Sequence, residues 1–436
     1  MGRTMRESGV TWIGQIPNNF KLTRLKFAAS LKGRIGWQGL KASEFTENGP
    51  YLITGTDFNN GIINWETCAH ISKERFEQDK AIHIKENDLL ITKDGTIGKV
   101  AVAKNCPLEV SLNGGVLIIR NDRTVKYDPR FLYYVLNSNE FTDWFDISDV
   151  GNSTIKHLTQ DKFYNFLFAY PEIQEQKRIA GYLDSRTKEA NRVITQIQSE
   201  ISILESYKRS VITEAVTKGL DENGEMKDSH IFYLGPINSR WHLSKIGYIC
   251  TKLQRNFSSE DIPLICTNKG TVEPRGNDVV GKMASEDNAM QGINIGDIAI
   301  HGMDTWHGAI ALSKFSGKIT RVVHVCDSTE DKRFVVYYLQ SLAYRNVYKV
   351  ISNGVRGNTS DFRSWPKVKD IWIPLPDRID QQRICDYVDM KCQKINQAVA
   401  LKKKQLEALD KYKQSLIYEY VTGKKEVPAS FKGETV

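Results

Sequence analysis

The chain has 436 residues and a mass of 49.7 kDa, enough for two or three domains that each bury a core of their own. Apolar residues make up 40% of it and charged residues 26%, ordinary globular proportions that exclude a disordered or fibrous protein. The 60 Lys and Arg exceed the 52 Asp and Glu and leave a net charge of +8, which permits a polyanionic partner without requiring one.

Neither a membrane span nor a disulfide framework is indicated by the sequence. No apolar run is long enough to cross a bilayer, and the first ten residues lack the apolar stretch of a secretory signal. The seven cysteines are scattered and never spaced as CxxC, which disfavours disulfides and a structural zinc site. We therefore expect a cytoplasmic protein with reduced, packed thiols, no bound metal and no membrane partner.

The first third of the chain is predicted to be a basic entry segment followed by a sheet-forming domain. Residues 8–43 contain six Lys and Arg and no acidic residue. The runs YLITG, DLLIT, KVAVA and GVLIIR follow, separated by Gly, Asn and Asp, and they have the β-branched and apolar composition of strands. A helix is predicted at residues 129–138.

The loop TKDGTIGK, residues 92–99, links two of these strands. It does not fit a P-loop, because Lys93 stands where the pattern needs its first glycine and no Ser or Thr follows Lys99. A plain strand-linking turn is one interpretation. The other is nucleic-acid contact through base edges or phosphates, for which the suited side chains are Lys93, Asp94, Thr96 and Lys99.

From Pro171 onward the pattern changes to a long helix with one apolar stripe. No Pro or Gly interrupts it between Gly181 and Gly219, so the helix can run for about 40 residues, roughly 60 Å. A sustained 3-4 spacing of this kind is typical of a coiled-coil seam. The seam residues are Leu183, Ala190, Ile194, Ile197, Ile201, Leu204, Val211 and Ala215.

The second half of the chain repeats this order. Residues 229–259 are again free of acidic residues and carry four Lys and Arg. The runs PLIC, DIAIH, AIALS and TRVVHV predict strands, and residues 332–344 are predicted to form a helix at the start of a third acid-free stretch, 332–360. The last long helix is predicted between Pro376 and Gly423, with the seam Val388, Cys392, Ile395, Val399, Leu406, Leu409, Leu416 and Tyr420.

The loop after the run DIAIH takes the place of residues 92–99 in the second half. It carries His301, Asp304, Trp306 and His307. Two His and one Asp on one loop could hold a metal ion, but the preferred interpretation is a loop of hydrogen-bonding side chains without a metal.

An internal repeat explains this order. Residues 171–217 align without gaps on residues 376–422, with 15 identities over 47 positions, too many for chance at one fixed offset. Residues 14–27 likewise match residues 235–248, so the ends of each half are retained while the middles have diverged. Because a lone helix cannot bury its stripe, we expect the two long helices to pack on each other, antiparallel. Each helix lying on its own domain is the alternative.

The distribution of charge and the sequence motifs limit the classes of function that this chain can have. Basic stretches at matching places in both halves favour two copies of a nucleic-acid-facing surface, with a solvated basic face as the alternative. A glycine-rich methyl-donor loop, an Asn-Pro-Pro-aromatic adenine pocket and a G-x-S-x-G elbow are all missing from the sequence. The sequence therefore indicates no catalytic centre of its own.

Four sequence segments together resemble the specificity subunits of type I restriction-modification enzymes. They are ESGVTWIGQIPNNFKLTRLK, TKDGTIGKVAV, GNSTIKHLTQDKF, and the run Pro-x-x-x-(Glu/Asp)-Gln-x-Arg-Ile that leads into both long helices. The resemblance covers nearly the whole chain. It implies a non-catalytic reader with two target-recognition domains, each reading one half of a bipartite site in double-stranded DNA.

The resemblance also implies partners. Specificity subunits of this family bind two modification subunits, which carry S-adenosylmethionine and methylate adenine, and two restriction subunits, which cleave with ATP and Mg. No cofactor is expected on this chain itself. Duplicated surfaces would let one chain dock two copies of a partner, and the long helices would set the spacing of the half-sites.

The expected fold class is α+β, with two pseudo-repeated mixed α/β DNA-recognition domains separated by two long conserved helices packed as an antiparallel coiled coil. The expected boundaries are 1–165 for the first target-recognition domain, 166–220 for the central helix, 221–370 for the second target-recognition domain, 371–422 for the C-terminal helix and 423–436 for a tail.

Two groups of residues are candidates for function, and none of them is catalytic. Polar residues of the loops, the basic stretches and the domain ends are candidates for DNA contact: Lys32, Arg34, Lys93, Asp94, Thr96, Lys99, Asn113, Lys156, His157, Arg255, Lys269, His301, Asp304, Trp306, His307, Arg356, Asn358 and Arg363. Residues identical in both helix copies are candidates for holding the scaffold and docking subunits: Gln176, Arg178, Tyr182, Tyr207, Gln381, Arg383, Tyr387 and Tyr412.

Two rival functions belong to other classes. One is a scaffold that assembles partner subunits through its long helices without reading DNA, and the basic stretches argue against it. The other is a self-sufficient DNA-modifying enzyme, which the missing catalytic motifs disfavour.

Overall fold

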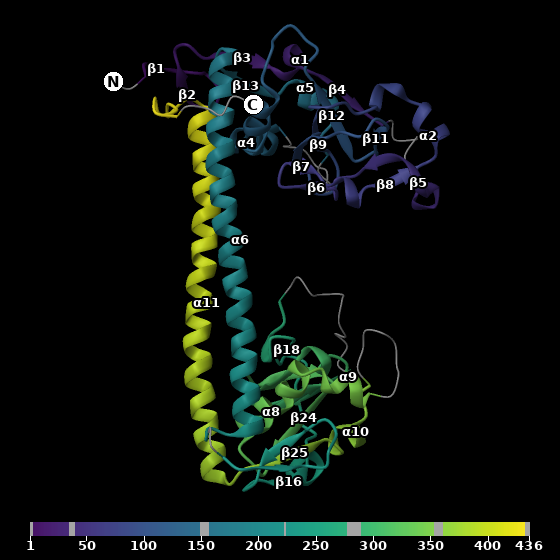
Figure 1. The fold of residues 1–436 in the computed structure, drawn as a ribbon, viewed down its shortest axis with the longest axis vertical. Helices are drawn as coiled ribbons and strands as arrows, with labels where there is room; N and C mark the ends of the chain where they lie inside the picture. The colour runs from purple at the N-terminus through teal and green to yellow at the C-terminus, as the bar shows by residue number, and fades with distance from the viewer. Residues whose placement is uncertain are drawn as a thin grey trace. The chain divides into compact units, whose positions relative to one another are not determined.

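Two units make up the computed structural model of the protein. The structure describes residues 3–34, 40–148, 157–221, 224–276, 289–352 and 361–431. Unit 1 combines Met1–Gln196 with Lys404–Val436, and unit 2 is Ile197–Lys403. Each unit therefore holds one recognition domain and a stretch of both long helices, α6 (Ile173–Lys218) and α11 (Arg378–Val421) (Figure 1).

The recognition domain of unit 1 is built from short strands and helices. In chain order they are β1 (Met5–Glu7), β2 (Gln15–Pro17), β3 (Lys21–Arg24), α1 (Leu25–Ala28), β4 (Ser30–Gly33), β5 (Phe45–Ile53), β6 (Phe58–Asn59), β7 (Ile62–Ile63), β8 (Ala69–Ile71), α2 (Lys73–Glu77), β9 (Leu89–Thr92), β10 (Val100–Val102), β11 (Val110–Leu112), β12 (Val116–Arg120), α3 (Pro129–Leu136), α4 (Asn139–Ser148), α5 (Gln160–Tyr164) and β13 (Leu167–Tyr170).

The recognition domain of unit 2 has the same kind of elements. In chain order they are β14 (Met226–Asp228), β15 (Pro236–Asn238), β16 (His242–Lys245), α7 (Ile246–Ile249), β17 (Cys250–Lys252), β18 (Pro263–Thr267), β19 (Thr271–Pro274), β20 (Met290–Ile293), β21 (Ile298–His301), β22 (Ile310–Leu312), β23 (Gly317–Thr320), β24 (Val323–Ser328), α8 (Lys332–Tyr344), α9 (Val347–Ile351), α10 (Trp365–Lys369) and β25 (Trp372–Leu375).

The sheets of the two units follow one plan. Unit 1 has the strand order β4-β12-β9-β10-β7-β6 in its larger sheet, and the first four positions recur in unit 2 as β17-β24-β21-β22. In both units a short strand from the end of the domain pairs antiparallel with one from its start, β13 with β3 and β25 with β16. These pairings close each recognition domain at the point where the long helix begins.

The central strands are buried on both faces. In β9, Leu89 and Ile91 belong to the core shared with the helices, whereas Leu90 belongs to a second core on the other face. In β21, Ile298 and Ile300 belong to the core shared with the helices, whereas Ala299 belongs to a second core on the other face. Successive strand side chains point to opposite faces, so a sheet covered on both sides needs the continuous apolar runs that the sequence has.

The two long helices pack antiparallel within each unit, as predicted. In unit 1 the Tyr182 and Tyr420 rings lie 4.8 Å apart, and Lys413 Nζ donates to Asn191 Oδ1 at 2.6 Å. In unit 2, Lys208 Nζ donates to Asn396 Oδ1 at 3.0 Å. None of the sixteen predicted seam residues is exposed. The repeat thus makes the same Lys–Asn bond twice, with the helices exchanging roles.

The predicted α+β fold class is confirmed, and so are the strands and the two shorter helices expected from the sequence. The helix α6 begins at Ile173, before Gly181, because a single helical glycine costs only about 1 kcal/mol and its buried neighbours offset that cost. The five-part domain division stays a prediction.

Candidate nucleic-acid interface

The loop between β9 and β10 is held at both ends by Thr92. Its backbone N–H donates to Lys99 O (2.9 Å), and its hydroxyl donates to Thr96 O (2.5 Å) and accepts from the Lys99 N–H (3.0 Å). Gly98 has φ of +85°, and a Cβ there would lie 3.1 Å from the Phe141 ring. Glycine is therefore required at this turn, and the loop keeps a defined backbone.

Three segments far apart in the sequence meet at this loop. The Lys93 N–H donates to Gly115 O (2.9 Å), and the Leu158 N–H donates to Lys93 O (3.1 Å). Asp94 accepts from Lys93 Nζ (2.7 Å) and lies 2.8 Å from His157 Nδ1. The predicted contact residues Lys93, Asp94 and His157 thus come together, and we call these three the loop-1 cluster.

Asp94 organises the charges of the loop-1 cluster. Burial acts to raise its pKa, but hydrogen bonds from Lys93 and His157 outweigh burial and leave the pKa of Asp94 below its usual value. A lysine ammonium has three N–H donors, and Asp94 uses one of them. The remaining donors of Lys93, together with the exposed residues Thr96 and Lys99, face solvent beside it and suit a phosphate or a base edge.

The corresponding loop of unit 2 lies between β21 and β22 and has different chemistry. His301 is buried at the end of β21, and its Nδ1 accepts from the backbone N–H of Asp304 at 3.1 Å. Trp306 donates its Nε1–H to Ser352 Oγ at 3.2 Å. His307 is exposed, so the loop offers an imidazole and a carboxylate where unit 1 offers lysines.

Arg363 joins this second loop from a distant segment. Gly302 lies so close to that segment that a Cβ on it would be 2.9 Å from Arg363 Cα and 2.9 Å from Phe362 O. Arg363 also donates to the sulfur of Met303. Glycine is required here by close approach of two backbones. We call His301, Asp304, His307 and Arg363 the loop-2 cluster.

The protonation of His301 follows from its position. Burial lowers the pKa of His301, and Arg363 lowers it further, against an opposing effect of Asp304. The described residues contain no group of three His, Cys, Asp or Glu arranged to hold a metal ion. The loop-2 cluster brings together hydrogen-bonding groups, the Asp304 carboxylate and the Arg363 guanidinium.

Arg34, a predicted DNA-contacting arginine, is buried. Its guanidinium donates to Leu112 O (3.0 Å) and to Ser111 Oγ (3.1 Å), and burial lowers its pKa. Because Arg34 is 4% exposed and two of its N–H donors bond within the domain, it joins strands of unit 1 and has little surface to offer a phosphate.

Arg255 pairs with buried Asp297 through two bonds, of 2.8 and 3.1 Å. In unit 1, Asp88, which stands before β9 as Asp297 stands before β21, binds Arg120 through two bonds. The arginines come from different strands of the shared plan, Arg120 from β12 and Arg255 from the segment after β17, so the part that recurs is a buried aspartate that anchors a guanidinium.

The remaining predicted DNA contacts are spread over the surface. Lys32 on the edge strand β4 and Lys269 in the β18–β19 turn are exposed. Asn113 is half-buried in the turn that contains Gly115, where its Oδ1 accepts from the Gly114 N–H at 2.7 Å. Three predicted residues lie outside the described part of the chain: Lys156, Arg356 and Asn358.

Each unit also has a hollow between its recognition domain and its stretch of the helix pair. The hollow of unit 1 has a volume of about 870 Å³, and that of unit 2 about 980 Å³. Basic side chains line both, and apart from Lys99 and Lys269 the sequence analysis did not single them out for DNA contact. They are Lys99, Lys104, Arg130, Lys188 and Lys413 in unit 1, and Lys208, Lys269, Lys314 and Arg333 in unit 2.

Gln176 and Gln381 hold each recognition domain onto its helix. Both side chains are 1% exposed. The Oε1 atom of Gln176 accepts from the Asp128 N–H (2.9 Å), and that of Gln381 accepts from the Asp331 N–H (3.0 Å). We call these two bonds the glutamine clamp. They explain why both helix copies have glutamine at this position. Because both side chains are buried, neither is accessible to a docking subunit.

The clamp belongs to a repeated motif that the sequence comparison missed. Residues 128–138, DPRFLYYVLNS, and residues 331–341, DKRFVVYYLQS, share six of eleven residues at an offset of 203. A search for short gapless matches inside the diverged middles would have found it. Both segments form a helix that packs on the sheet with the shared strand order, α3 on β10 in unit 1 and α8 on β22 in unit 2.

A second contact of this motif also recurs. In unit 1, Asp184 of α6 accepts from Arg130 Nη1 (3.0 Å) and from the Tyr134 hydroxyl (2.7 Å). The unit 2 counterparts, joined by the same contacts, are Asp389, Arg333 and Tyr337.

Tyr207 and Tyr412 are helix candidates that stay accessible, and Arg178 and Arg383 are exposed as well. The two tyrosine side chains are 50% and 52% exposed, so internal packing does not account for their identity in the two copies. The other candidates lie in the first turns of α6 and α11, where Tyr182 is buried and Tyr387 is half-buried.

Comparison with known proteins agrees with this arrangement. Residues 38–202 match the family model of the type I restriction modification DNA specificity domain. The chain is 23% identical over 433 residues to a protein assigned as the type I restriction enzyme MjaX specificity subunit of Methanocaldococcus jannaschii, with 95% of each chain covered. It is also 23% identical over 383 residues to the type I restriction enzyme MjaVIII specificity subunit of that organism, covering 79% of this chain and 81% of that one.

A solved structure shares the fold. It is a chain from a study of complex assembly and conformational transition of the type I R-M system, 16% identical, with a TM-score of 0.66 over 94% of this chain and 99% of that chain. The fold of this chain is thus that of a type I R-M system chain, and residues 38–202 match a DNA specificity domain. The predicted resemblance to the specificity subunits of type I restriction-modification enzymes is confirmed.

Proposed function

We propose that the chain reads a bipartite site in double-stranded DNA, with each unit reading one half, as the specificity subunit of a type I restriction-modification complex. One observation carries this proposal: the two units build the same frame from identical residues but place loops of different chemistry on it. The loop-1 cluster presents Lys93 and His157 on either side of Asp94, and the loop-2 cluster presents His307 and Arg363. Matched frames with different contact residues are expected of two readers of different base sequences.

We further propose that the accessible tyrosines Tyr207 and Tyr412 contact two copies of a modification subunit, and that restriction subunits join the same complex. Identical exposed residues on a repeated helix pair would offer two equal docking points. S-adenosylmethionine, ATP and Mg would belong to those partners, and this chain would be non-catalytic. It would act in the cytoplasm, where the DNA is. Within the described residues, no helix combines the length and the apolar character that a membrane span needs.

Sequencing of methylated adenines in a living host tests the proposal. One host expresses this chain with its modification partner, and the control host lacks only this chain. We expect a split motif with a fixed spacer to be methylated in the first host and unmethylated in the second. An unchanged methylome in a host with an active partner would refute DNA reading and leave a scaffold.

A further inference from the structure

A buried imidazole of unit 2 lies on the strand beside the loop-2 cluster. His324 of β24 is 2% exposed, and it lies opposite Ile300 of β21 in the sheet. Its Nε2 atom is 2.8 Å from the carbonyl oxygen of Phe362. A carbonyl oxygen only accepts, so Nε2 carries the proton and donates it to this bond. His324 therefore holds the residue next to Arg363, a member of the loop-2 cluster.

The second ring nitrogen of His324 makes this imidazole costly to bury. With the proton on Nε2, Nδ1 is an acceptor, and it has no hydrogen-bond partner among the described residues. Burial lowers the pKa of His324, the bond to Phe362 opposes burial, and Lys252 and His301 lower the pKa further, so the ring is neutral at physiological pH. An apolar side chain would avoid the cost of the unpaired nitrogen.

Unit 1 has such an apolar side chain at the matched position. The shared strand order pairs β12 with β9 and β24 with β21. Leu117 lies opposite Ile91, the third residue of β9, and His324 lies opposite Ile300, the third residue of β21. Leu117 is fully buried. The frame thus accepts leucine at this position, and the imidazole serves a contact that belongs to unit 2.

The segments that meet the two loops present their side chains in opposite order. Each segment runs into a short helix, α5 in unit 1 and α10 in unit 2. Two residues before α5, Leu158 is buried, and His157 before it faces Asp94. Two residues before α10, Arg363 is exposed, and Phe362 before it is buried. Counted from the helix, the residue offered to the loop has therefore moved by one position.

The contacts of Phe362 account for this change. Its ring packs edge-on against Tyr348 in the core, with ring centroids 5.1 Å apart, and its carbonyl oxygen accepts from His324. The His324 ring also lies beside Trp365 of α10, with centroids 5.4 Å apart. Because neighbouring side chains of an extended segment point to opposite sides, Arg363 faces outward when Phe362 is held inward. Leucine, the residue of unit 1, has no N–H to hold that carbonyl.

We propose that His324 is a positioning residue for DNA reading by unit 2, which turns the Arg363 guanidinium towards a base edge by holding the Phe362 carbonyl. The planar fork of an arginine matches the O6 and N7 acceptors of guanine, so the base is a guanine of the half-site that unit 2 reads. This inference rests on the proposed function. It adds the residue that decides which side chain of the segment meets the DNA.

Amide hydrogen exchange of the full-length chain tests the hold on the segment. His324→Leu gives unit 2 the residue that unit 1 buries at this position, and residues 361–365 should exchange roughly threefold to tenfold faster, the effect of losing one buried hydrogen bond. His324→Gln keeps an N–H donor and should restore most of the protection. His324→Met also lacks a donor but fills the site differently, so it should behave as His324→Leu does and separates lost bonding from poor packing.

Sequencing of methylated adenines tests the consequence for DNA reading. In a host with the modification partner, His324→Leu should relax the preference for one guanine in one half-site and leave the other half-site unchanged. Arg363→Ala should relax the same position. The double variant should relax it no further than Arg363→Ala alone, because both substitutions remove one contact. His324→Gln should retain the original preference, which a role limited to filling the core would not require.

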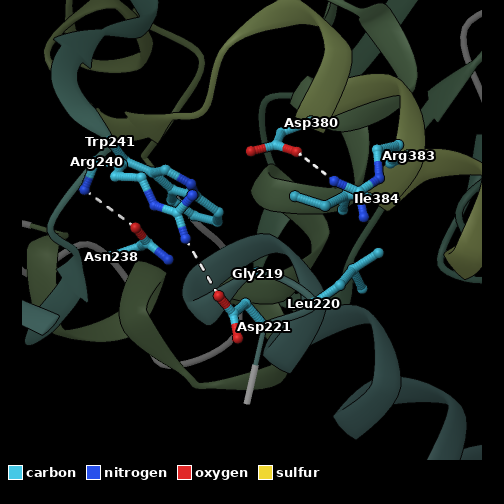
Figure 2. A pocket seen from close by; sticks show the side chains of 9 residues that line it. All are labelled: Gly219, Leu220, Asp221, Asn238, Arg240, Trp241, Asp380, Arg383 and Ile384. Atoms are coloured by element: carbon cyan, nitrogen blue, oxygen red, sulfur yellow. Dashed lines mark hydrogen bonds and ion pairs between the residues drawn. The ribbon is translucent and has the colours of Figure 1, made fainter. Parts of the chain in front are cut away.

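Arg240→Ala is the matched control for the loss of an exposed arginine from unit 2. Arg240 lines a different pocket, where it donates to Asp221 at 3.2 Å and where no member of the loop-2 cluster lies (Figure 2). Its side chain is 73% exposed. This variant should read both half-sites as the unaltered chain does.

Several results would overturn the proposal. One is unchanged exchange of residues 361–365 in both His324→Leu and His324→Met, whatever the methylome shows. Others are a change in both half-sites, no recovery with His324→Gln, or effects of His324→Leu and Arg363→Ala that add. A methylome that does not depend on this chain refutes the proposed function instead, because the exchange measurement needs no DNA and still shows whether His324 holds the segment.

Discussion

At the level of single residues, acidic side chains decide how basic ones are presented. Asp94 keeps a pKa below its usual value and so remains charged over the physiological range, which holds Lys93 and His157 beside each other at the surface. Asp297 has a different effect on Arg255, because the buried carboxylate binds the Nε and Nη2 edge of the guanidinium through two bonds. An aspartate thus holds basic side chains at the surface in one place and anchors an arginine within the fold in another.

Lys93→Ala and Lys99→Ala are each expected to weaken DNA binding. The loss should be ~1–3 kcal/mol where the lysine contacts a base, and a smaller salt dependence should appear where it contacts a phosphate. Anisotropy titrations of a target duplex over a series of salt concentrations measure both quantities. Lys126→Ala, at an exposed lysine outside the loop-1 cluster, is the control. If affinity and salt dependence are unchanged in both variants, the loop does not face DNA.

Glu140 is a buried carboxyl group of α4 that the function does not use. It is 1% exposed, and neither of its carboxylate oxygens has a hydrogen-bond partner among the described residues. Burial raises the pKa of Glu140 to about 8, with Lys424 acting in the opposite direction. Unit 2 has Ala343 at the corresponding position, which shows that the frame does not need a carboxyl group there.

Glu140→Gln is expected to remove a loss of stability at alkaline pH. The folded state binds this proton more tightly than the unfolded chain, so stability falls as the pH rises from about 4.5, the ordinary value, through about 8. The slope is about 1.4 kcal/mol per pH unit for one proton. Urea unfolding between pH 5 and pH 9 should show that the free energy of unfolding of the variant, relative to that of the unaltered chain, rises with pH. If the free energies of unfolding of the two proteins change in parallel with pH, the carboxyl group of Glu140 has a hydrogen-bond partner in solution.

At the level of elements, each recognition domain is fixed to its long helix by a few repeated polar contacts. The glutamine clamp joins the start of α3 to α6 and the start of α8 to α11. About two helical turns further along α6 and α11, Asp184 binds Arg130 and Tyr134 of α3, and Asp389 binds the matching Arg and Tyr of α8. These contacts orient the sheet and its loop relative to the helix, so that different loops can be carried on one frame.

Gln176→Met is expected to destabilise unit 1 by about 1–3 kcal/mol, because it leaves the buried Asp128 N–H without an acceptor. Gln381→Met should destabilise unit 2 by a similar amount through Asp331. Amide hydrogen exchange of α3 and α8 separates the two effects. Gln198→Met, at an exposed position of α6, is the control and should change neither helix. An effect confined to one unit would show that the clamps are not equivalent.

At the level of the whole molecule, two units share two continuous helices. The boundary between the units falls between Gln196 and Ile197 in α6 and between Lys403 and Lys404 in α11. Every contact between the helices described above lies within one unit. The helices can therefore be lengthened near the boundary without disturbing the packing of either recognition domain.

Lengthening both helices by one turn is expected to change the spacing of the half-sites. Four residues inserted after Thr195, with a compensating four after Ala400, add about 6 Å, nearly two base-pair steps of about 3.4 Å. Sequencing of methylated adenines should then show the same two half-sites with a longer spacer. Retention of the original spacer would refute the role of the helices in setting it.

Periodic features of this protein could be predicted from its sequence. The seams of α6 and α11, the continuous apolar runs of β9 and β21, the repeat and the family resemblance all depend on residues close together in the chain or on one fixed offset. The presence of a loop at residues 92–99 with side chains suited to DNA could be predicted in the same way. These properties are local, and local patterns determine them.

The partners of individual side chains were decided only by the tertiary structure. The bond of Asp94 to His157, the burial of Arg34 against Leu112 and the approach of Gly302 to Arg363 join segments more than sixty residues apart, and no local pattern distinguishes them. The identity of Gln176 and Gln381 appeared in the sequence, but its cause, an internal clamp, did not. Charge and spacing are encoded along the chain, whereas burial and the occupancy of each donor depend on which distant strands and helices pack together.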